Sequence, residues 1–81
     1  MDWKERLKHE HEDLIERRDK LRGFIGTTEF LSLEPMDQEA LRAQCSLMTV
    51  YVDILTRRRQ RQIKRDLAAD RETHNLSIND D

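Results

Sequence analysis

The chain has 81 residues, of which 36% are hydrophobic, 40% are charged, two are Gly and one is Pro, and its net charge is −2. So short a chain forms one domain at most and buries little surface as a monomer. With so few turn residues, it favours long helices that complete their core by self-association, and it excludes a β-sandwich or an α/β enzyme. Its apolar runs are too short to cross a membrane, and its single cysteine excludes an intramolecular disulfide and fits a reducing cytoplasm.

The first predicted helix covers residues 3–22. Leucines recur in it every seven residues, and alternating steps of four and three residues define one face: Leu7, His11, Leu14, Arg18, Leu21 and Ile25. His11 and Arg18 are the polar members of this otherwise apolar row. A histidine in such a row is either a hydrogen-bonded packing residue, which is the commoner case, or a contact to a ligand.

The predicted connection covers residues 23–34. Gly23 and Gly26 mark the point where the first helix weakens, and the segment from Gly26 to Thr28 has the composition of a turn. The apolar residues that follow, above all Phe30, are expected to fold back as a short helical turn or a buried loop.

The second predicted helix covers residues 35–69, because Pro35 suits a first helical turn and no helix breaker follows it. One row of its residues is expected to pack against the first helix. This row has an apolar residue on one flank at Leu47 and another on the opposite flank at Val52. The apolar arc spans roughly half the circumference, more than one partner helix covers, so we expect a second copy of the chain to cover the rest. The row itself consists of Leu41, Gln44, Met48, Tyr51, Leu55, Arg58 and Gln62.

The sequence thus predicts an all-α protein: an antiparallel helical hairpin over residues 1–69 with a short connecting turn, assembling into a compact homo-oligomer. The polar, acidic tail over residues 70–81 is expected to fray.

The charge is unevenly distributed. Residues 57–65 carry six basic side chains and no acidic one, whereas residues 66–81 carry one basic and five acidic side chains. Such a block is either a solvated helix end or a local contact for an anion. Its acidic surroundings argue against DNA or RNA as a ligand, because non-specific binding needs many phosphate contacts.

Motifs for catalysis are missing from the sequence. It contains no Gly-rich phosphate loop, no nucleophile elbow and no pair of metal ligands at the usual spacing, and His9 and His11 point to different helix faces. We therefore expect no enzyme activity, no cofactor and no metal site.

Four segments in a fixed order resemble a known family. They are E-R-L-x-x-E-H-x-D-L at residues 5–14, K-L-x-x-F-I at 20–25, F-x-x-L at 30–33, and L-x-x-Q-x-x-x-M-x-x-Y-x-x-x-L-x-x-R at 41–58. This combination resembles the small phage proteins that counter CBASS immunity, whose helical hairpin is shared with a class of anti-Thoeris proteins.

The resemblance implies a non-catalytic sponge in the host cell cytoplasm. Such proteins bind cyclic oligonucleotide messengers, for example cyclic GMP-AMP, and withhold them from host effectors. They typically form hexamers that hold cyclic dinucleotides between antiparallel protomers, and some hold cyclic trinucleotides at a separate site.

The resemblance also implies site residues. An aromatic side chain of the first helix stacks on a base in the family, and that position, often Tyr in relatives, is His11 here, a smaller ring that can still stack. The neighbouring polar residues and the residues near the helix ends complete the candidate set: Lys8, Glu12, Gly26, Thr27, Thr28, Thr56, Arg57 and Arg58.

Two other functions remain open from the sequence. A helical-hairpin oligomer that binds a protein partner, without a nucleotide ligand, fits the periodicity equally well. A small nucleic-acid-binding protein that uses the basic block at residues 57–65 fits the net charge less well.

Overall fold

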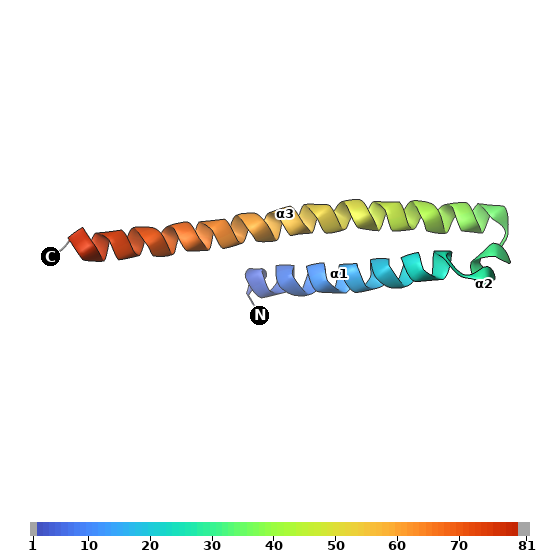
Figure 1. The fold of residues 1–81 in the computed structure, drawn as a ribbon, viewed down its shortest axis with the longest axis horizontal. Coiled ribbons are helices and arrows are strands. Elements are labelled where there is room, and N and C mark those ends of the chain that lie inside the picture. The colour runs from blue at the N-terminus through green and yellow to red at the C-terminus, as the bar shows by residue number, and fades with distance from the viewer. Residues whose placement is uncertain (1, 80–81) are drawn as a thin grey trace.

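The computed structural model describes the backbone of residues 2–79 and the side chains of residues 2–70. Over these residues the chain is all-helical, with the order α1 (Trp3–Ile25), α2 (Thr28–Leu31) and α3 (Pro35–Asn79). Helix α1 lies beside α3 and runs in the opposite direction, and α2 occupies the turn between them (Figure 1). The molecule is a rod of 72 × 20 × 17 Å, because α3 continues well beyond the start of α1. The prediction of an all-α chain is confirmed.

Helix α1 is capped at both ends by local contacts. The side chain of Asp2 accepts a hydrogen bond from the backbone N–H of Glu5, as an N-cap residue does. At the other end α1 continues to Ile25, three residues past the expected end at residue 22. Gly23 therefore does not stop the helix, since its cost of about 1 kcal/mol relative to Ala is offset by the packing of the residues after it.

The turn is organised around a buried phenylalanine. Phe30 of α2 has no exposed surface, and its ring meets that of Phe24 edge-on at 6.0 Å between centroids. The guanidinium carbon of Arg42 lies 5.1 Å from the Phe30 ring centroid. Thr27 caps α2, since its hydroxyl accepts from the N–H of Phe30 and donates to the carbonyl of Phe24. The expected short helical turn is thus present, with Phe30 as its buried residue.

Helix α3 begins at Pro35, as the sequence predicts, but it runs to Asn79 and not to residue 69. No Gly or Pro follows Pro35, so the backbone meets no residue that disfavours a helix. Of the expected tail over residues 70–81, the side chains from residue 71 on and all of residues 80–81 lie outside the described part. The division of the chain into a domain and a tail stays a prediction.

The packing row of α1 is the predicted one, whereas that of α3 is displaced. Leu7 and His11 are buried and the later members of the α1 row are half-buried. On α3 the buried residues are Val52 and Leu55, and Tyr51, expected in the row, is 41% exposed. The row is therefore rotated toward the flank that contains Val52.

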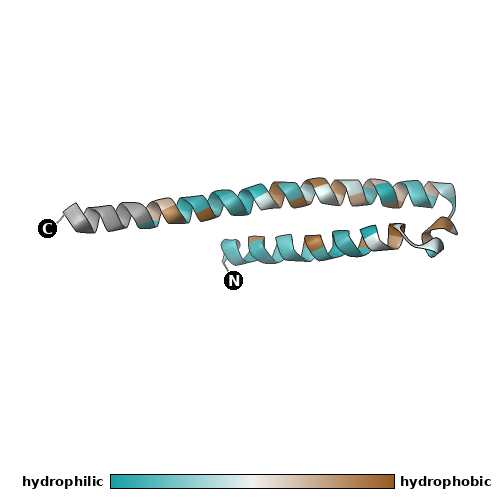
Figure 2. Ribbon diagram, viewed as in Figure 1, coloured by the Kyte–Doolittle hydropathy of each residue, from teal (hydrophilic) through white to brown (hydrophobic). Residues whose placement is uncertain are grey.

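This rotation leaves one face of α3 uncovered in the single chain. This face contains three exposed aliphatic residues, which we call the apolar stripe: Leu47 (71% exposed), Val50 (56%) and Ile54 (46%). Figure 2 shows brown, hydrophobic residues in the turn and the first half of α3, and mostly teal, hydrophilic residues where the start of α1 meets α3. In the described part of the chain, no helix is long and apolar enough to span a membrane.

Candidate ligand-binding site

His11 lies inside the contact between α1 and α3, at the position that the leucine row assigns to it. Its side chain is only 9% exposed. Its Nε2 lies 2.8 Å from the hydroxyl of Thr56, and its Nδ1 lies 3.0 Å from a guanidinium nitrogen of Arg59. Both ring nitrogens therefore have partners on α3.

The partners of the imidazole determine its proton arrangement. Arg59 can only donate, so Nδ1 of His11 accepts. The Thr56 hydroxyl donates its proton to the carbonyl of Val52 at 2.8 Å, so Nε2 of His11 carries the proton and donates to that hydroxyl. The chain of donors runs from Arg59 through His11 and Thr56 to the backbone, and it requires a neutral imidazole.

The electrostatic surroundings favour the same neutral form. Burial is the main cause that lowers the pKa of His11 below its usual value of 6.5, and the Arg59 guanidinium lowers this pKa further. The carboxylate of Glu12 acts in the opposite direction, but the net change is downward. A proton on Nδ1 would also displace the hydrogen bond from Arg59.

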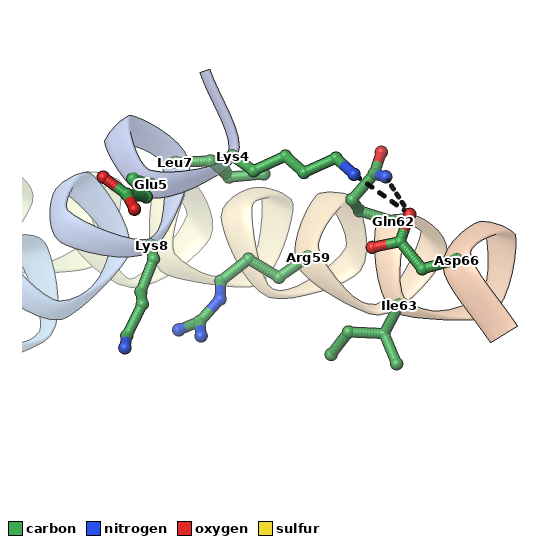
Figure 3. Close-up of a pocket in the computed structure, with 8 residues that line it drawn as sticks. All are labelled: Lys4, Glu5, Leu7, Lys8, Arg59, Gln62, Ile63 and Asp66. Atoms are coloured by element: carbon green, nitrogen blue, oxygen red, sulfur yellow. Dashed lines mark hydrogen bonds and ion pairs between the residues drawn. The ribbon is translucent and has the colours of Figure 1, made fainter. Parts of the chain in front are cut away.

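A surface pocket opens beside this network, between the start of α1 and the second half of α3. Its volume is about 240 Å³, and Leu7 and Ile63 form apolar parts of its wall. Figure 3 shows Lys8 from α1 and Arg59 from α3 extending to the same side of the pocket. On its other side, Lys4 forms an ion pair of 3.1 Å with Asp66, which also accepts from the Gln62 amide at 2.8 Å.

The pocket therefore combines two cations that form no ion pair, the carboxylate of Glu5 and an apolar wall. In the described residues, neither Lys8 nor Arg59 forms an ion pair. Such a combination suits an anion that carries an apolar or aromatic part.

The structure brings some of the predicted site residues together. One region where α1 meets α3 contains His11 and Thr56, which are hydrogen-bonded. It also contains Lys8, which lines the same pocket as Arg59, the other partner of His11. Glu12 follows His11 and acts on its pKa, while Arg57 is exposed on α3 next to Thr56.

Another group of predicted residues lies at the opposite end of α1. Gly26 is 15 residues after His11, which is roughly 22 Å along a helix at about 1.5 Å per residue. Thr27 is engaged in capping α2, and the carbonyl of Thr28 accepts a weak bond from Ser32 at 3.5 Å. One chain thus does not bring Gly26, Thr27 and Thr28 near His11.

The predicted stacking role of His11 stays a prediction. With both nitrogens bonded and 9% of its surface exposed, the ring offers no open face in this conformation. A base could stack on it only after the side chain is uncovered.

Sequence reasoning missed Arg59, the second partner of His11. The signal was present, because Val52, Leu55, Thr56 and Arg59 follow the helical spacing i, i+3, i+4, i+7. The expected row passed through Arg58 instead, one residue away. It also made Tyr51 a core residue, whereas its hydroxyl donates to Glu10 at the surface, which raises the pKa of Tyr51.

No metal centre is found among the residues that the structure describes, since no three His, Cys, Asp or Glu side chains gather there. A family model described as Sequestin matches residues 1–61, which include α1, α2 and the part of α3 that contacts His11. Neither the curated proteins nor the solved structures give a match.

Proposed function

The chain belongs to the Sequestin family, and we propose that it binds and sequesters cyclic oligonucleotide second messengers without converting them. Its ligands are cyclic dinucleotides such as cyclic GMP-AMP, and cyclic trinucleotides. By holding them in the host cytoplasm, it keeps them from the effectors of CBASS immunity. The observation that carries the proposal is the family match over three quarters of the chain, because the family is named for sequestration.

The chemistry of the region around His11 supports an anionic ligand. Cyclic oligonucleotides carry phosphates, and charge-assisted hydrogen bonds from arginine and lysine are the strongest that a protein offers to phosphate. Lys8 and Arg59 flank one apolar-walled pocket, and Arg57 and Arg58 directly precede Arg59 in the same turn of α3.

Two chains in antiparallel contact would complete the proposed dinucleotide site. Thr27 and Thr28 lie roughly 22 Å or more from His11 within one chain, at about 1.5 Å per residue. A partner chain running the other way places its own turn beside His11. A ligand with two phosphates and two bases then meets equivalent groups from each side, and its binding stabilises the assembly by mass action.

The apolar stripe supports self-association, for which we propose a hexamer. Its three side chains are about half or more exposed in the single chain, although they are aliphatic and adjacent. Leu47→Glu should reduce the mass measured by light scattering from several times 9.8 kDa to that of one chain. Gln60→Glu adds the same charge to an exposed site off the stripe and should keep the assembly. An unaltered mass for Leu47→Glu would exclude the stripe as the contact.

Calorimetric titration with cyclic GMP-AMP tests the ligand and the site together. If His11 stacks on a base, His11→Ala weakens binding by about 1–3 kcal/mol, the scale of one base–aromatic stack. His9→Ala, an exposed position two residues away, is the matched control and should bind as the parent does. An assembly that takes up no cyclic nucleotide would instead be a helical interaction module.

A further inference from the structure

A second cluster, near the start of α1, combines a tryptophan with arginines of α3. Trp3, the only tryptophan of the chain, is 53% exposed at the first position of α1. Together with Leu7 and Gln62 it lines a pocket of about 250 Å³. The remaining lining residues are Arg58, Arg61 and Arg65 of α3.

The three arginines share one face of α3. They are three and four residues apart, so their side chains project on the same side of the helix. Within the described residues, none of the three guanidinium groups forms a hydrogen bond or an ion pair. Like charges on adjacent turns repel one another, and a bound anion would relieve this repulsion. The cluster is therefore electrostatically suited to bind an anion.

An exposed indole beside unpaired guanidinium groups matches one class of ligand. Arginines bind phosphate through paired N–H groups, and a tryptophan face stacks on a nucleobase. The pocket is smaller than the roughly 300–1,000 Å³ of sites that enclose a whole ligand, so it suits a single nucleotide unit.

We propose that Trp3, Arg58, Arg61 and Arg65 form a nucleotide-binding site that is complete within one chain, with the base on Trp3 and the phosphate on the arginines. The site deepens the proposed function, because it names a second place, and a stacking residue, for ligands of the same chemistry. A cyclic oligonucleotide and a linear nucleotide both carry a base and a phosphate. The experiment therefore uses one of each.

Trp3 reports on its own site through its fluorescence. Titration with cyclic GMP-AMP, and separately with its linear counterpart, should quench the emission of Trp3 and saturate. Trp3→Ala should weaken binding in calorimetry by about 5- to 150-fold, and Trp3→Tyr should restore most of it, since a tyrosine ring also stacks. Because Trp3 is 53% exposed, we expect the fold to survive the change, and circular dichroism checks this.

The arginines are tested by replacing two of them, with a neighbouring exposed lysine as the control. Arg61→Ala combined with Arg65→Ala should abolish the quenching, and Lys64→Ala should leave it unchanged, because Lys64 is exposed between them but does not line the pocket. Quenching by only the linear nucleotide would keep this site and assign it to linear ligands. Calorimetric binding of the cyclic ligand with unchanged Trp3 emission, and equal affinity in Trp3→Ala, would overturn this site while the proposed function stands. If neither ligand alters the emission, the site is likewise excluded.

Discussion

The two ends of the contact between α1 and α3 are held by different forces. At the turn, the buried side chain is the phenyl ring of Phe30, which meets the Phe24 ring edge-on and has the Arg42 guanidinium over its face. At the start of α1, the buried side chain is His11, held by directional bonds to Thr56 and Arg59. The turn is thus suited to fix the fold, whereas the other end keeps polar and charged groups close to solvent, where the proposed ligand would bind.

The largest effect is expected at the turn. Phe30→Ala removes a fully buried ring and should lower the free energy of unfolding by about 3–5 kcal/mol. Urea denaturation followed by circular dichroism measures it. Leu31→Ala, at a residue that is 66% exposed, should change stability by less than about 0.5 kcal/mol. Equal effects at both positions would mean that α2 does not anchor the turn.

A smaller loss is expected at the polar end from Thr56→Val. The change keeps the shape of the side chain but leaves the Nε2 proton of His11 without an acceptor, at a cost of about 1–3 kcal/mol. Thr49→Val is the control, since its hydroxyl bonds the carbonyl of Cys45 in the same way and has only a 3.5 Å contact with Arg22 besides. Urea denaturation of both variants measures the loss in unfolding free energy. Equal losses would show that the bond to His11 does not contribute to stability.

The pH dependence of stability should also distinguish the two ends. The pKa of His11 is lower in the folded chain than the usual 6.5, so the unfolded chain binds its proton first. The stability that His11 contributes is complete above about pH 6.5 and is lost as the pH falls through the folded pKa. His11→Gln removes this titration. Between pH 7 and pH 5, the unfolding free energy of the variant should therefore fall less steeply than that of the parent chain. Parallel curves for parent and variant would contradict the neutral network.

The smallest effect is expected for the exposed ion pair between Lys4 and Asp66. Both side chains are about half exposed, so water screens the attraction, and Lys4→Ala should cost about 0–1 kcal/mol. A chemical denaturation series at low and high salt checks it. A loss as large as that of Phe30→Ala would show that the charged end, and not the turn, holds α1 in place.

Much of the fold could be predicted because it follows from local spacing. The leucine repeat identified the face of α1 that packs, and Pro35 identified the start of α3. The end of α1 cannot be read from Gly23, since this glycine is tolerated when Phe24 packs on Phe30, a contact that depends on the folded turn. The rotation of the α3 row was missed for a similar reason: its wide apolar arc allows several faces to meet α1.

The candidate site was harder to predict than the fold. His11 was identified as the polar residue in the row, but whether a histidine packs or contacts a ligand depends on partners from another helix. Thr56 is a candidate ligand-binding residue from the sequence, and the structure gives its hydroxyl a hydrogen bond to His11. The sequence does not single out Arg59, because it is one of six basic residues at 57–65. It does not single out Trp3 either, since only the folded chain shows that these residues line pockets.

The central claim is that the chain holds a cyclic oligonucleotide and returns it unaltered. The most direct measurement incubates the protein with excess cyclic GMP-AMP, removes free ligand by gel filtration, heat-denatures the protein and identifies the released nucleotide by mass spectrometry. We expect intact cyclic GMP-AMP to co-elute with the protein and to be recovered in full. A protein fraction free of nucleotide, or one that releases the linear product, would contradict it.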